Sequence, residues 1–193
     1  TISRASARFG KAVTCIDAKS PYHRKMAAVD ALAAWNRLHA LAGTQFGLFT
    51  ATQAGRHGIA HHDLSRRAQG GELYRAHRGV YGFSADAADM CPYADWAGRW
   101  LALRPGADIA ERRTNPDCIV SHDSAASIRD LGTLPSRGLY LTGPRLVTSS
   151  SRIHAYRREF GPLGIDWELL DGFPVATAGR IIADLAGDRI DGS

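Results

Sequence analysis

TATQAGRHGIAHHDLSRRAQG, residues 50–70, is the stretch of this sequence that decides its fold. It opens with Thr50 three residues before Gln53, the spacing of a capping box, in which the Thr hydroxyl accepts a backbone hydrogen bond and the Gln side chain reaches back. A short helix is therefore expected to begin directly after Thr50. Gly58 predicts the turn that follows this helix, and Ile59 is expected to be buried.

A second helix is expected over residues 61–69. Leu64 and Ala68 are four residues apart, so they share one face of this helix, which we expect to be buried. The opposite face carries only hydrogen-bond donors and acceptors: His61, His62, Ser65, Arg66 and Gln69. Two short helices joined by a turn with glycine, the second with a polar outer face, are typical of a helix-turn-helix that inserts side chains into the major groove of DNA.

Two β-prone segments follow the second helix. Gly70 and Gly71 end the helix, and the sequence then alternates over residues 73–76 and 80–83. His-Arg-Gly at residues 77–79 joins these segments, which predicts a hairpin with a basic tip. Two helices followed by such a hairpin predict a winged helix-turn-helix.

Each of these signals also has an explanation that needs no DNA. Two helices and a hairpin occur in many folds, and basic outward faces are usually only solvated. The adjacent His61, His62 and Asp63 suggest metal ligands, but neighbouring helical residues diverge by about 100° and cannot bind one ion without strain. No metal site is therefore expected.

The charge is divided along the chain. Residues 1–83 carry 12 Lys and Arg against 4 Asp and Glu, a net charge of +8, and six of the eight histidines. Residues 84–193 carry 12 Lys and Arg against 15 Asp and Glu, a net charge of −3. A basic half of this size favours nucleic-acid binding, although membrane surfaces and acidic proteins also attract it.

Composition restricts the protein class. The chain has 193 residues, 45% of them hydrophobic, which suits a folded protein with one large or two small cores. No apolar stretch is long enough to span a bilayer and no signal peptide is evident, so a cytoplasmic protein is expected. Cys15, Cys91 and Cys118 are odd in number and widely spaced, which argues against a disulfide framework and a zinc site.

The winged segment is preceded by an arm and a helix. Residues 1–24 are expected to form a basic N-terminal arm. From Lys25 to Leu41 the apolar residues recur at roughly helical spacing and predict an amphipathic helix that buries, among others, Met26, Val29 and Leu32. Trp35 is expected to be a partly buried packing residue.

The second half has a mixed α/β pattern. A helix is expected over residues 92–103, with Trp96, Trp100 and Leu103 in the core, and another from a Ser121 cap to Leu131. The apolar run 118–120 and residues 139–142, 146–148 and 165–170 are expected to form strands. A closing helix follows Thr177, with Ile181, Ile182 and Leu185 on its buried side and an Arg180–Asp184 pair. The expected fold class is therefore α+β, a winged helix-turn-helix domain plus a small mixed α/β domain.

No residues were found that could carry catalysis. Ser121, His122 and Asp123 have the residue types of a serine triad, but consecutive positions at a helix start are expected to point in different directions, so a capping role for Ser121 is preferred. The common nucleotide-binding, hydrolase and metalloprotease motifs are missing. The sequence predicts neither an enzyme nor a cofactor.

Two segments resemble a known family. Residues 47–54 and 58–81 are similar to the N-terminal winged helix-turn-helix of AbiEi-type antitoxins, from bacterial abortive-infection and type IV toxin-antitoxin operons. Residues 171–186 resemble the closing strand, turn and helix of that family's C-terminal domain, and residues 120–126 fit its mid-domain helix start. The sequence departs from the pattern at Ala60, where a capping Ser or Thr is usual, and at Ala176 and Ile182, where Thr is common.

The resemblance implies a repressor that binds double-stranded DNA repeats in its own operon promoter. It also implies a second role, opposing a nucleotidyltransferase-like toxin without the need for a stable complex. The expected domains are the arm at 1–24, the DNA-binding domain at 25–88 and an α/β antitoxin domain at 92–193. A winged-helix protein adaptor and a small-molecule-responsive regulator remain as alternatives.

The DNA-contacting residues are expected in the two helices and the hairpin. His61, His62, Ser65 and Arg66 are candidates for base edges, because they lie near the start of the second helix opposite Leu64. The full expected set is Thr50, Thr52, His61, His62, Ser65, Arg66, Arg67, Gln69, Arg75, His77 and Arg78.

Overall fold

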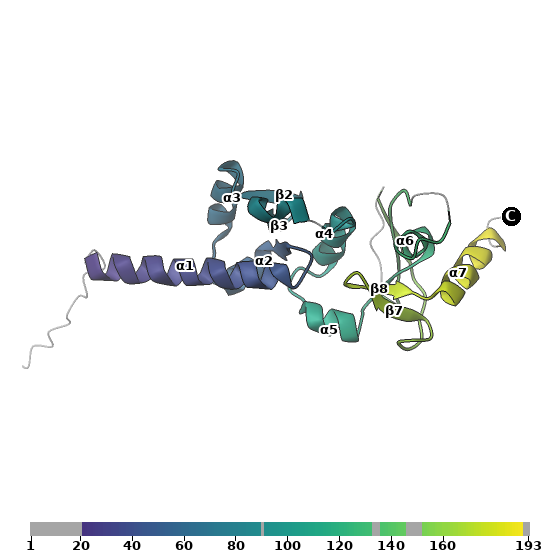
Figure 1. The fold of residues 1–193 in the computed structure, drawn as a ribbon. Helices are drawn as coiled ribbons and strands as arrows, with labels where there is room; N and C mark the ends of the chain where they lie inside the picture. The colour runs from purple at the N-terminus through teal and green to yellow at the C-terminus, as the bar shows by residue number, and fades with distance from the viewer. Residues whose placement is uncertain (1–20, 90, 133–135, 146–151, 191–193) are drawn as a thin grey trace, which may run out of the picture.

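The computed structural model describes residues 21–89, 91–132, 136–145 and 152–190. Its N-terminal half is a winged helix-turn-helix (Figure 1). Its elements are α1 (Pro21–Gly43), β1 (Leu48–Thr50), α2 (Ala51–Arg56), α3 (His61–Gln69), β2 (Leu73–His77) and β3 (Val80–Phe83).

The capping box at the start of α2 is confirmed. The Thr50 hydroxyl accepts from the Gln53 amide at 3.1 Å, and the Thr50 amide donates to the Gln53 side chain at 2.9 Å. The bounds of α3 are those predicted, and Leu64 is fully buried. Ala60 precedes α3 in an extended conformation and provides no side-chain cap.

The predicted hairpin is confirmed as β2 and β3, which belong to a three-stranded sheet of order β1-β3-β2. Antiparallel pairing places Tyr74 opposite Gly82, and the Tyr74 ring covers this glycine so closely that a Cβ there would overlap it. Gly82 is therefore required by packing within the wing.

The prediction for α1 is partly wrong. The helix exists, but Met26, Val29 and Leu32 are 45%, 55% and 62% exposed. Its second half is buried instead, through Ala34, Leu38 and Ala42, which pack with Phe49 and Leu64. The predicted packing role of Trp35 is confirmed, since it lies partly buried against the same cluster.

The C-terminal half combines a five-stranded mixed sheet with helices. The order of the sheet is β6-β5-β4-β8-β7, in which β4 is parallel to β8 and β5 to β6. The helices α6 and α7 pack against each other, and α6 also packs on β5 and β8. The elements are η1 (Ser84–Asp89), α4 (Ala94–Leu103), α5 (Ile109–Thr114), β4 (Ile119–Val120), α6 (His122–Ile128), β5 (Leu139–Thr142), β6 (Ile153–Tyr156), β7 (Trp167–Leu170), β8 (Phe173–Ala176) and α7 (Ala178–Ile190).

Several predictions in this half need correction. The expected strand at 146–148 lies outside the described residues, whereas β6 was missed. The helix α6 ends at Ile128, three residues early, because Asp130 adopts a positive φ of 54°. On α7 the Arg180–Asp184 pair is confirmed at 3.0 Å, but Ile182 is exposed rather than buried.

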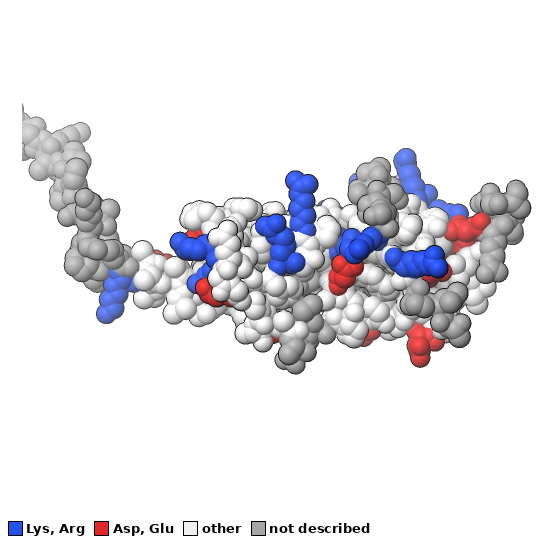
Figure 2. Space-filling model, turned by 90° about the horizontal axis from the view of Figure 1, so that it is seen from above, with Lys and Arg blue, Asp and Glu red and all other residues white. Residues whose placement is uncertain are grey.

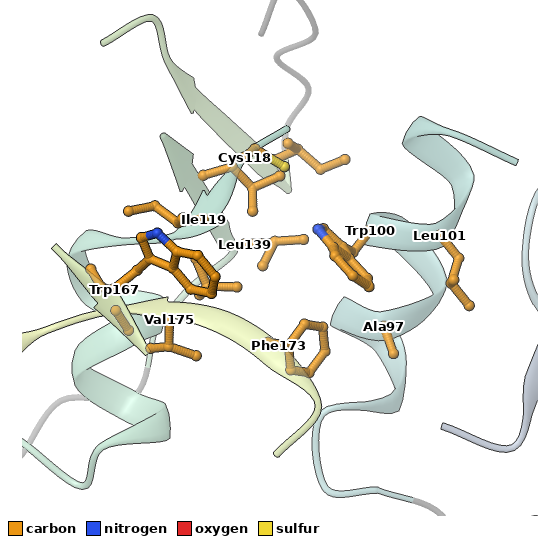
Figure 3. Close-up of a cluster of buried hydrophobic side chains, with 14 of the residues drawn as sticks. Ala97, Trp100, Leu101, Cys118, Ile119, Leu139, Trp167, Phe173 and Val175 are labelled. Atoms are coloured by element: carbon orange, nitrogen blue, oxygen red, sulfur yellow. The ribbon is translucent and has the colours of Figure 1, made fainter. Parts of the chain in front are cut away.

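One core connects the two halves. Leu48 and Val80 of the winged sheet belong to the same buried cluster as Trp100 of α4 and Phe173 of β8. Figure 3 shows Phe173 and Trp100 facing each other between the C-terminal sheet and α4. Since α4 also packs on β1, β2 and β3, it covers the winged sheet. The division into domains near residues 88–92 stays a proposal.

Phe46 and Arg113 add a second connection. The Phe46 ring stacks on Phe173 with centroids 4.5 Å apart. Arg113 donates to the carbonyls of Gly172 at 3.0 Å and Thr44 at 2.9 Å, which joins the β7–β8 turn to the turn after α1. Among the described residues, no helix has the length and hydrophobicity needed to cross a bilayer.

Candidate nucleic-acid interface

The outer face of α3 is open to solvent. His61, His62, Arg66 and Gln69 are exposed and Ser65 is partly exposed, while Leu64 on the opposite side is fully buried. This separation follows from the helical period for His62, Ser65, Arg66 and Gln69, which lie about 100–160° around the helix from Leu64. His61 lies on the Ala68 side of the helix, where it is exposed at the first residue of α3. The helix can therefore approach a groove without losing its packing.

Asp63 is hydrogen-bonded to Arg66 and lies near His62. Arg66 donates to one carboxylate oxygen of Asp63 at 2.5 Å, and the His62 Nε2 lies 3.5 Å from the other. The Arg66 side chain is still 74% exposed. An exposed ion pair of this kind contributes little to stability, so Arg66 can exchange Asp63 for an acceptor on DNA at small cost. The three-residue spacing of Asp63 and Arg66 on a helix is a sequence signal for this ion pair.

Arg67 has different surroundings from its neighbour. Its guanidinium lies 4.0 Å from the centroid of the Trp35 ring and 2.6 Å from a Glu72 carboxylate oxygen. These contacts connect α3 to α1 and to the start of β2. Arg67 therefore has a packing role, and a phosphate contact would have to compete with Glu72.

The tip of the wing presents a basic side chain that has no ion-pair partner within the described part of the chain. Arg78 is exposed in the two-residue turn between β2 and β3. Arg75 is exposed as well and donates to the Tyr81 hydroxyl at 3.2 Å. His77 is only partly exposed, because β2 packs there against Gly98 of α4, and its Nδ1 has no hydrogen-bond partner among the described residues. His77 therefore lies directly before the turn, as the sequence predicts, but its Cβ packs near α4.

The two threonines at the start of α2, the N-cap Thr50 and Thr52, differ in exposure to solvent. Thr52 is exposed, but Thr50 is 1% exposed. The Thr50 hydroxyl caps α2 and donates to the Pro105 carbonyl. Thr50 therefore acts in the fold, and its side chain cannot reach DNA.

Lys and Arg side chains line the face of the molecule that Figure 2 shows. Figure 2, the view from above, shows them in a row that begins over α1 and α3, continues over the β2–β3 hairpin and extends over the C-terminal half. Acidic side chains are interspersed in this row, more of them over the C-terminal half. The face that carries α3 and the wing is therefore basic, a property that favours nucleic-acid binding.

The contact between Ser121 and His122 differs from the prediction. Their Oγ and Nδ1 atoms are 2.8 Å apart, because His122 adopts a positive φ of 48° that turns its ring back toward Ser121. Ser121 occupies the N-cap position, but its side chain makes no cap hydrogen bond. The His122 Nε2 lies 3.3 Å from an Asp188 carboxylate oxygen, which completes the residue types of a triad.

This cluster is closed to substrates. Ser121 and His122 are 0% and 1% exposed, and Tyr156 stacks on the His122 ring with centroids 3.9 Å apart. A nucleophile needs access to a reacting carbon, which is lacking here. Elsewhere, Cys118 is a free and buried thiol whose pKa burial raises to about 12, so it is not a reactive thiolate at neutral pH. No cluster in the described part of the chain has the residues to bind a metal.

Comparison with known proteins identifies the winged segment. No curated protein matches the chain. Residues 36–84 match the family model of the AbiEi antitoxin transcriptional regulators, from the second half of α1 to the end of the wing. The match thus covers α2, α3 and the hairpin that the sequence identified. The winged helix-turn-helix segment of this chain is therefore similar to the AbiEi antitoxin transcriptional regulators, over 49 of its 193 residues.

Proposed function

We propose that this protein is a repressor-antitoxin that binds repeats in the promoter of its own toxin-antitoxin operon. The observation that carries the proposal is the exposed polar face of α3 beside the basic tip of the wing, in a segment of the AbiEi family. His61, His62, Ser65, Arg66 and Gln69 would enter the major groove. Arg78 would contact phosphate or the minor groove. Binding to a bacterial promoter requires that the protein act in the cytoplasm.

A mobility-shift titration with the DNA upstream of the operon tests this proposal. Because phosphate contacts release counterions, the affinity is expected to fall with salt, with a log-log slope of about −0.9 for each neutralised phosphate. Unrelated duplex DNA of equal length is the control. Failure to shift any upstream fragment would contradict the repressor and favour a winged-helix adaptor that binds an acidic protein.

The antitoxin role rests on the family, with a nucleotidyltransferase-like toxin as the functional partner and no stable complex required. A growth test with the toxin under an independent promoter separates this role from repression. The full chain is expected to restore growth, and so is a variant with Arg66→Ala, because neutralisation would not need promoter reading. If neither protein restores growth at unchanged toxin levels, the antitoxin role is wrong.

A groove favours a small-molecule-responsive regulator as the second candidate. It has a volume of about 910 Å³ and is lined by residues from both halves, including Arg56 of α2, Arg104 after α4 and Arg145 after β5. A ligand there would contact α2 of the winged helix-turn-helix together with the segments before β4 and after β5. A change in operator affinity on adding an effector would support this candidate.

A further inference from the structure

The first half of α1 carries apolar side chains that the fold leaves uncovered. All residues from Lys25 to Leu32 are exposed, including Met26, Val29 and Leu32. Figure 1 shows this part of the helix extending past the rest of the winged unit. An unpacked helix of about this length is marginal in water, so most of its stability has to come from packing of an amphipathic face.

Met26 and Val29 begin a stripe that points away from the body of the protein, whereas Leu32 lies about 80° around the helix from the centre of this stripe. Met26, Val29 and Ala33 lie on a line that continues to Asn36 and Ala40, both of which are exposed. At 100° per residue, the centre of this stripe is about 160° around the helix from the buried line of Ala34, Leu38 and Ala42. A second helix could therefore lie along α1 without meeting the winged unit.

The spacing of the stripe is that of a short coiled coil. Met26 and Val29 occupy successive a and d positions, and Ala33 begins the next heptad. In this register Lys25 is at a g position and Asp30 is at the e position of the next heptad. In a parallel coiled coil, a g residue of one helix faces the e residue five positions later on the other helix. Neither Lys25 nor Asp30 has an ion-pair or hydrogen-bond partner among the described residues.

We propose that a second copy of this chain covers the stripe, with the two α1 helices parallel and in register. Met26 and Val29 of one copy would then pack against the same residues of the other. Each Lys25 would pair with Asp30 of the opposite helix. An interface of about two heptads is small, so the pair is expected to be weak and concentration-dependent. This proposal does not depend on DNA binding.

Cysteine cross-linking of the full-length chain tests the pairing. In a Cys15→Ser, Cys91→Ser background, Val29→Cys places a thiol at a d position, where parallel helices bring equivalent residues together. Ala31→Cys is the matched control, because Ala31 is also exposed but lies on the opposite side of the helix. Mild oxidation is expected to give a covalent dimer with Val29→Cys and little with Ala31→Cys. Equal yields, or no dimer with Val29→Cys, would overturn the proposal.

A charge exchange tests the parallel orientation by sedimentation equilibrium. Lys25→Asp alone is expected to weaken dimerisation by about tenfold, since two attractive pairs become repulsive. The double variant Lys25→Asp, Asp30→Lys should restore it, because the pairs form again with their signs reversed. A protein that stays monomeric at all concentrations, or a double variant no better than the single one, would overturn the proposal. The circular dichroism spectrum of each variant verifies its fold.

Discussion

Arg66 and Arg67 are neighbours on α3, but their contacts suit them to different roles: Arg66 is free to contact a DNA base, whereas Arg67 packs within the protein. Arg66 extends into solvent beside Asp63, whereas Arg67 lies on Trp35 and pairs with Glu72. We therefore expect Arg66→Ala to weaken binding to the cognate repeat by about 1–3 kcal/mol and to relax discrimination at one base pair. Quantitative mobility shifts on the repeat and on single-base variants measure both effects.

Two controls accompany Arg66→Ala. Arg67→Ala is expected to weaken all sequences alike and to reduce the salt slope by about 1 if Arg67 contacts phosphate. Leu64→Asp should unfold the winged unit, because it buries a carboxylate without a partner. An equal loss of specific and non-specific affinity in Arg66→Ala, with the fold intact, would show that Arg66 contacts only phosphate.

His122 makes the stability of the C-terminal half dependent on pH. Burial lowers the pKa of His122 below 6.5, an effect that Asp184 and Asp188 oppose. As the pH falls below 6.5, the unfolded chain binds a proton that the folded protein does not, so stability is expected to decrease. His122→Asn should flatten this dependence, because Asn tolerates the positive φ and does not titrate. Melting temperatures at a series of pH values measure the effect, and identical slopes for both proteins would contradict it.

At the scale of elements, two glycines of the winged unit have opposite roles. Gly82 lies under the Tyr74 ring, so Gly82→Ala is expected to displace Tyr74 and destabilise the protein by about 1–3 kcal/mol. Gly55 of α2 has no atom within 4 Å of an added Cβ, so Gly55→Ala is expected to stabilise the helix by about 0.5–1 kcal/mol. Urea unfolding of both variants measures the difference. A neutral Gly82→Ala would mean that the wing tolerates a rearranged Tyr74.

At the scale of the whole molecule, the shared core predicts a single unfolding transition. Phe173 contacts both Phe46 and Trp100, so Phe173→Ala is expected to cost about 3–5 kcal/mol and to lower the melting temperature of both halves. Leu169→Ala is the control, because Leu169 lies 48% exposed on the neighbouring strand and should change stability by less than about 0.5 kcal/mol. Tryptophan fluorescence and loss of DNA binding follow the transition. Two separate transitions would show that the domains fold independently.

The sequence by itself determined the elements whose signals are local. The Thr50–Gln53 capping box, the bounds of α3 and the paired strands of the wing all follow from interactions between residues close in the chain. Such interactions need no contact with distant parts of the chain, so the local sequence is enough to predict them. The polar face of α3 could be assigned for the same reason, since Leu64 fixes its rotation.

Only the tertiary structure decided which apolar surfaces are covered. Periodicity identifies the face of α1 with Met26 and Val29, but it cannot say whether another element reaches that face. It likewise could not place α4 on the winged sheet or bring His122 onto Ser121, because these contacts depend on how distant segments meet and on a positive φ. Burial is a property of the assembled chain, so residues with the same local pattern end in the core or in solvent according to what packs against them.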